Sequence, residues 1–155
     1  MTWDLIIILF LTGIGFLLGL MLGKNRIFLM LLGAYISSAL LSVIPVKKMF
    51  PDFFGREENF VVMIVSFLVL IGIIYFIFSK SILKSKSGAR PIFQVFFYGL
   101  FLVGIILTMV FSFLPEDLIS QFSSLTLKIF NTSLARTLWF LIPLVFIGIF
   151  KRNGK

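Results

Sequence analysis

Long runs of apolar residues, separated by short charged segments, are the main pattern of this sequence. A transmembrane helix needs about 20 mostly apolar residues to cross roughly 30 Å of hydrocarbon. Four runs have this length, and they lie at Trp3–Leu22, Ile27–Val46, Phe60–Phe78 and Ile92–Leu114. A fifth run, Leu134–Phe150, is shorter and contains Arg136 near its start and Pro143 in its middle. A slightly short span tolerates both, because arginine reaches the headgroups and neighbouring helices accommodate the kink.

The segment Pro115–Phe130, between the last two runs, has a different pattern. Glu116 and Asp117 suit the first turn of a helix, where the dipole favours acids. Apolar residues then recur at i, i+4, i+7 and i+11, and they are Leu118, Phe122, Leu125 and Ile129. This spacing predicts one amphipathic helix that lies in the membrane–water interface on the outer side of the membrane. We interpret it as a surface connector in preference to a docking surface for a partner.

These patterns together predict an all-α membrane protein. We expect five transmembrane helices and one interfacial helix in a single integral membrane domain over residues 1–155. Composition supports this, because 60% of the residues are hydrophobic and 13% are charged, against about 45–50% and 25% in ordinary globular proteins.

The charges predict how the chain is oriented, because Lys and Arg beside spans are retained on the cytoplasmic side. Five spans place nine bases and no acid on one side, and all six acids with five bases on the other. We therefore expect the N-terminus outside and the C-terminus in the cytoplasm, in a bacterial cytoplasmic (inner) membrane. Basic loops beside spans explain the net charge of +8, so the expected partner is the lipid bilayer and not nucleic acid.

Small residues recur at every fourth position of the first two spans. The first row is Gly15, Gly19 and Gly23, and the second row is Ala34, Ser38 and Ser42. Such rows let helix backbones approach closely in a membrane. Because the connection between the two spans is short, we expect a tight antiparallel hairpin. We expect the two rows to face each other or a second copy of the chain.

Candidate chemistry is sparse. The chain has neither His nor Cys, which excludes imidazole catalysis, thiolate nucleophiles and the usual zinc, haem and iron–sulfur ligands. The acid pairs Glu57-Glu58 and Glu116-Asp117 precede or begin helices, where capping explains them better than a cation site. We therefore predict no catalytic residue, no cofactor and no metal site, and a protein that is not an enzyme.

Polar residues inside the first four spans are limited to hydroxyl and amide side chains and phenols. Hydroxyl groups in membrane helices commonly bond back to their own helix, and we expect this of most of them. A coupled transporter would need ionisable residues or broken helices in the membrane. A passive pore of several copies, lined by the serines of the second span, stays as an alternative.

The opening of the chain carries a resemblance to a known family. Met-Thr-Trp-Asp4 runs directly into the first span, Gly19 and Gly23 lie near its inner end, and Lys24 and Arg26 begin a short basic turn. The stretch 117–123 follows the fourth span. In these features residues 1–130 resemble the colicin V production protein family. Two features depart from that family. The fourth span has Phe93-Gln94-Val95-Phe96-Phe97 in place of the family's glycine-rich, Arg-containing entry, and a fifth span follows.

The resemblance implies a small bacterial inner-membrane protein needed for secretion or envelope maintenance, without an established catalytic activity. The family-type positions that it implies are Asp4, Gly19, Gly23 and Arg26. The leading hypothesis is a non-enzymatic assembly or accessory subunit, working as a homo-oligomer or with other membrane subunits of an envelope or secretion-related complex. The alternative is a passive oligomeric channel or holin-like pore. A membrane enzyme acting on lipid ranks third.

Overall fold

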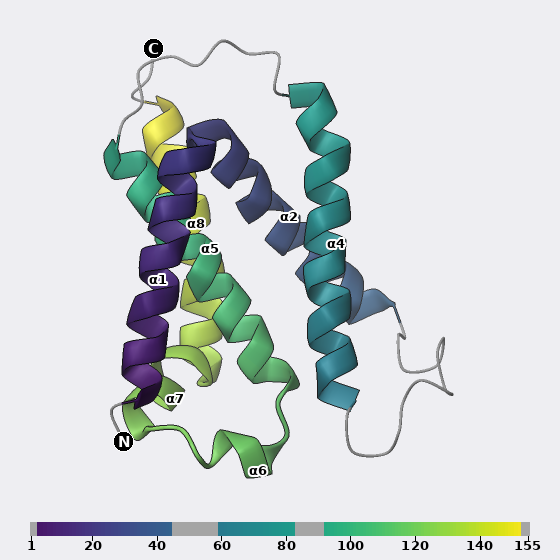
Figure 1. Cartoon of the computed structure of the whole chain (residues 1–155), viewed down its shortest axis with the longest axis vertical. Helices are drawn as coiled ribbons and strands as arrows, with labels where there is room; N and C mark the ends of the chain where they lie inside the picture. The colour runs from purple at the N-terminus through teal and green to yellow at the C-terminus, as the bar shows by residue number, and fades with distance from the viewer. Residues whose placement is uncertain (1–2, 45–58, 83–91, 153–155) are drawn as a thin grey trace.

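The described part of the chain consists of helices joined by short turns. A computed structural model describes residues 3–44, 59–82 and 92–152 (Figure 1). Its helices are α1 (Trp3–Leu22), α2 (Lys24–Val43), α4 (Asn59–Ile82), α5 (Ile92–Phe113), α6 (Glu116–Ile119), α7 (Ser124–Phe130) and α8 (Ser133–Arg152). No strand occurs within these ranges. The all-α prediction is confirmed for this part, whereas the predicted end of the second span at residues 45–46 lies outside it.

Four helices are long and apolar enough to cross a membrane: α1, α2, most of α4 and α5. The fifth candidate span is a pair of helices, in which α7 and the part of α8 up to Ile149 are joined at a bend of 51°. The structure therefore supports four to five membrane-spanning helices. The predicted fifth span, Leu134–Phe150, corresponds to α8. α8 is long and apolar enough to cross a membrane only together with α7.

Gly23 forms the connection between α1 and α2. Its φ of +85° lies in the left-handed region, which glycine adopts without the steric penalty that a Cβ would bring. Its N–H donates to the carbonyl of Gly19 at 2.9 Å, so the chain reverses within one residue. The predicted short turn is present, but the two helices are not a tightly packed pair, because α1 packs mainly on α5 and α2 mainly on α4. Lys24 and Arg26, however, belong to the first turn of α2 and not to a loop.

The bundle has an acidic end and a basic end. Asp4 at the start of α1 lies at the same end as the final turn of α5, α6, α7 and the start of α8 (Figure 1). Lys24 and Arg26 lie at the other end, where α1 meets α2 and where α4 finishes with Lys80 in its last turn. The long helices in the described part of the chain thus alternate in direction, and the predicted orientation in the membrane stays a prediction.

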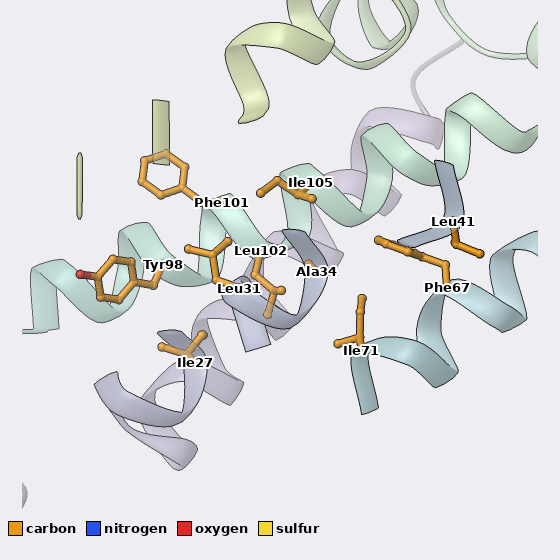
Figure 2. Packing of buried hydrophobic residues seen from close by; sticks show 10 residues of the cluster. All are labelled: Ile27, Leu31, Ala34, Leu41, Phe67, Ile71, Tyr98, Phe101, Leu102 and Ile105. Carbon is orange, nitrogen blue, oxygen red and sulfur yellow. The ribbon is translucent and has the colours of Figure 1, made fainter. Parts of the chain in front are cut away.

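The core lies where α2 packs between α4 and α5. Figure 2 shows its cluster of buried side chains, which come from these three helices: Ile27, Leu31, Ala34, Leu41, Phe67, Ile71, Tyr98, Phe101, Leu102 and Ile105. Gly33 brings α4 close, because a Cβ placed on it would lie 3.4 Å from the carbonyl oxygen of Ile71. Dispersion contacts of this kind hold membrane helices together, since lipid offers no hydrophobic driving force between them.

The predicted single interfacial helix over Pro115–Phe130 is wrong. The segment forms two short helices, α6 and α7, with a turn between them. The predicted apolar face does not pack as a unit either, because Leu125 and Ile129 are 56% and 44% exposed and Leu118 and Phe122 are half-buried. The buried residues of α7 are Thr126 and Phe130. Because a new helix starts after Ser123, the apolar residues before and after it do not lie on one continuous helix face.

α1 and α5 approach each other at a pair of glycines. A Cβ placed on Gly15 would lie 3.2 Å from the carbonyl oxygen of Gly99, and a Cβ on Gly99 would lie 2.8 Å from the carbonyl oxygen of Gly15. One turn further along α1, a Cβ on Gly19 would lie 2.8 Å from Cγ1 of Val95. Gly15 and Gly19 therefore leave no space for a side chain.

The two small-residue rows therefore do not face each other within the chain, and their packing against a second copy stays a prediction. Gly15 faces α5, and Gly19 lies against both Val95 of α5 and Ile27 of α2. Gly23 forms the turn, with no atom within 4 Å of its Cβ position. In the row of α2, Ala34 is part of the core, and the hydroxyls of Ser38 and Ser42 donate to the carbonyls of Tyr35 and Ala39. Both rows are spaced for close packing, but spacing does not specify the partner helix.

We expect Gly15→Leu to destabilise the fold, because the added side chain must push α1 away from the backbone of Gly99. Overpacking of a close contact costs about 1–3 kcal/mol. Thermal unfolding of the purified protein in a mild detergent measures the effect. Gly72→Leu is the matched control, because nothing lies within 4 Å of the Cβ position of Gly72. Equal unfolding temperatures for the two variants would contradict the α1–α5 contact.

Candidate functional site

The start of α1 is bonded to the start of α7 through the Asp4 carboxylate. Its Oδ2 accepts a hydrogen bond from the backbone N–H of Ser123 at 2.8 Å and another from the hydroxyl of Thr126 at 2.7 Å. The same charged oxygen accepts both hydrogen bonds, and hydrogen bonds to a charged group are stronger than those between neutral groups. We call this set of three residues, Asp4, Ser123 and Thr126, the carboxylate clamp.

The clamp also caps α7. Ser123 is the N-cap residue, and its Oγ accepts from the N–H of Thr126 at 3.4 Å. The two hydroxyl oxygens of Ser123 and Thr126 are 3.0 Å apart. The Ser123 side chain also lies within hydrogen-bond reach of the Asp4 carboxylate. Thr126 is fully buried, and these bonds satisfy its hydroxyl group as burial requires.

Aromatic rings fix the other end of α7. Phe130 stacks against Phe111 of α5, with ring centroids 6.0 Å apart, and against Trp139 of α8, with centroids 5.5 Å apart and an interplanar angle of 8°. The Trp139 indole N–H donates to the carbonyl of Ile129 at 2.8 Å. The ring of Trp139 occupies the space that a Cβ on Gly104 would need. α7 is thereby held at both ends by side chains of other helices.

Arg136 links α8 to its neighbours at the acidic end. Its guanidinium donates to Oδ1 of Asn131 at 2.8 Å and to the hydroxyl of Ser112 at 3.5 Å. Asn131 belongs to the bend between α7 and α8, and Ser112 lies in the last turn of α5. The predicted arginine near a span end is thus used to fasten the bend to α5.

A pocket of about 350 Å³ lies beside the clamp. Its lining combines one carboxylate with one amide and apolar side chains, and the residues are Trp3, Asp4, Ile7, Leu114, Leu118, Gln121 and Phe122. Asp4 already accepts two hydrogen bonds here, so it acts as a structural anchor. Among the described residues, no group of three or more acidic side chains is placed to hold a metal ion. The Glu57-Glu58 pair lies outside the described residues.

Most hydroxyl groups within the described spans bond to their own helix, as the sequence predicts. Thr12 donates to the carbonyl of Ile8 at 2.9 Å, and Thr108 donates to the carbonyl of Gly104 at 2.7 Å. Ser38 and Ser42 behave in the same way. Tyr35 differs, because its hydroxyl donates across to the Phe140 carbonyl of α8 at 2.6 Å. These bonds stabilise helices and helix contacts.

The four family-type positions have separate places in the structure. Asp4 lies in the clamp, Gly19 in the α1–α5 contact, Gly23 in the turn and Arg26 in the first turn of α2. They do not form one site. Sequence reasoning missed Ser123, Thr126 and Trp139, although a serine followed three residues later by a polar side chain is a capping signal that could have located the start of α7.

Comparisons of the chain with protein-family models, with curated proteins and with solved structures find no match.

We expect Asp4→Asn to loosen the acidic end, because a neutral amide oxygen is a weaker acceptor than a carboxylate. Backbone hydrogen exchange should become severalfold faster in residues 123–126, while the core of α5 keeps its protection. Exchange measured by mass spectrometry in detergent tests this.

Asp117→Asn is the control for the Asp4 variant. It removes the same charge from the same end, at an exposed position in the first turn of α6. If both variants gave the same exchange pattern, net charge and not the clamp would be responsible.

Proposed function

We propose that the protein is a non-enzymatic assembly or accessory subunit of a bacterial cytoplasmic membrane complex, and that α1 is the helix through which it contacts a partner. The partner is another membrane protein or a second copy of the chain. The resemblance of residues 1–130 to the colicin V production family favours an envelope or secretion-related complex. The observation that carries the proposal is the one-sided packing of α1.

α1 uses only one face within its own bundle. Gly15 and Gly19 are its buried residues, and α1 lies at the edge of the bundle (Figure 1). The opposite face carries large apolar side chains, with Phe10 69% and Leu17 58% exposed. Gly13 lies between them and has no atom within 4 Å of its Cβ position. A helix turns about 100° per residue, so Gly13 points away from Gly15.

This outer face has the form of a helix-packing surface. Phe10, Gly13 and Leu17 recur at i, i+3 and i+7, which places them in one stripe. The glycine between two large side chains leaves a hollow that a side chain of a neighbouring helix can fill, and small residues are enriched at such membrane interfaces. Hollows also flank the buried face of α1, where a pocket of about 290 Å³ is lined by Gly19, Leu20, Gly23, Ile92 and Val95.

A pore lined by the serines of α2 is less well supported. Ser37, in the middle of the helix, has no exposed surface. Ser38 is half-buried and gives its proton to its own helix. A water-filled path along this face would need α2 to leave α4 and α5. Dye leakage from liposomes that contain only this protein would favour the pore over the accessory subunit.

Photo-crosslinking tests the outer face of α1. We expect a photoreactive amino acid at Phe10 or Leu17 to give one protein adduct of defined mass in the native membrane, because this face lies against a partner helix. Ile73 of α4 is the control position, since it is also apolar and is 50% exposed. There we expect lipid adducts.

Gly13→Leu should reduce the Phe10 adduct severalfold by filling the hollow, without lowering the unfolding temperature of the isolated protein. Adducts with lipid alone at Phe10, Leu17 and Ile73 would show that α1 faces the bilayer and would refute the proposal.

A further inference from the structure

We propose that the groove between α5, α7 and α8 binds one anionic membrane phospholipid. An acyl chain occupies the apolar groove, and the phosphate of the headgroup lies beside Lys128. The groove shares no residue with the partner surface proposed above for α1, so the two proposals are independent. It adds a ligand of defined chemistry to a protein whose other contacts are between helices.

The groove has a volume of about 340 Å³ and an apolar wall with one cation. Its main contributors are Leu100 and Phe101 of α5, Lys128 and Ile129 of α7, and Leu138 and Ile142 of α8. Lys128 is the one charged residue in this lining. An apolar channel with a single positive charge is complementary to an amphiphile with an apolar tail and a negative headgroup.

The length of the groove matches one leaflet. Lys128 lies on α7 at the acidic end of the bundle (Figure 1). From Ser133, the first residue of α8, a rise of about 1.5 Å per residue places Ile142 about 14 Å further into the bundle. Half of the hydrocarbon thickness of a bilayer is about 15 Å. A lipid whose headgroup is at Lys128 therefore places its tail along Leu138 and Ile142 without crossing the midplane.

The wall of the groove is fixed before any lipid arrives. Trp139, which lines it, is held by the hydrogen bond from its indole to the carbonyl of Ile129 and by stacking on Phe130. A preformed site loses less conformational freedom on binding than a mobile one. The neighbouring cation, Arg136, already donates to Asn131 and Ser112. Lys128 is exposed and is the cation positioned for a phosphate.

Trp139 fluorescence reports occupancy of this groove directly. The chain has two tryptophans, so Trp3→Phe leaves Trp139 as the only emitter. The variant is reconstituted into vesicles that contain a small fraction of either brominated phosphatidylglycerol or brominated phosphatidylcholine, because bromine on the acyl chain quenches a tryptophan in contact with it. We expect the anionic lipid to be preferred about fivefold, as one lysine near a membrane surface provides.

Charge variants separate a specific site from general attraction. Lys128→Gln should bring the preference close to one, while Lys128→Arg should retain it. Lys24→Gln removes a positive charge at the basic end and should change nothing. The Trp139 emission maximum and the helical circular dichroism confirm that each variant is folded.

Three outcomes would overturn the proposal. Equal quenching by the two lipids would make the groove an ordinary lipid-facing surface. A preference that persists in Lys128→Gln would place the phosphate elsewhere. An absence of quenching by either lipid would mean that protein, and not lipid, covers the groove. None of these outcomes bears on the crosslinks from α1, so this proposal and the proposed function can fail separately.

Discussion

The close approach of α1 and α5 at Gly15 and Gly99 is the contact on which the rest of the arrangement depends. Helices in a bilayer gain little by exchanging lipid for apolar side chains, so the separation of their backbones decides which pairs are stable. Glycine on both partners brings the backbones together and fixes the height of α1 along α5. At that height the first turn of α1 lies level with the end of α5, and Asp4 reaches α7.

The acidic end is organised by side chains that come from distant parts of the sequence. α7 has only seven residues, and an isolated helix of this length is unstable in water. Asp4 accepts a hydrogen bond from its first turn. Trp139 stabilises its last turn by a hydrogen bond to Ile129 and by stacking on Phe130. The bend between α7 and α8 is held in turn by Arg136. The acidic end is therefore held together by hydrogen bonds and an aromatic stack, whereas the basic end contains the tight turn at Gly23.

The spans were predictable because bilayer thickness sets the length of the apolar runs. Helices α1, α2 and α5 begin and end within a few residues of the predicted bounds. The pairing of helices was not predictable, since the glycine row of α1 fits any close neighbour and Gly99 stands in a run of aromatic residues. The break at Ser123 was hidden for another reason. Its strongest hydrogen-bond acceptor, Asp4, lies at the opposite end of the sequence, and the apolar periodicity across the break suggested a continuous helix.

Gly23 is the whole connection between α1 and α2. A one-residue connection is too short for the first helix to span a membrane while the second remains outside it. In a bilayer, so short a connection requires the two helices to be inserted together, with Lys24 and Arg26 beside the turn. The left-handed backbone at Gly23 is what allows so short a connection. A side chain at residue 23 would strain this turn, and the strain would act on α1 and α2 even before α5 is synthesised.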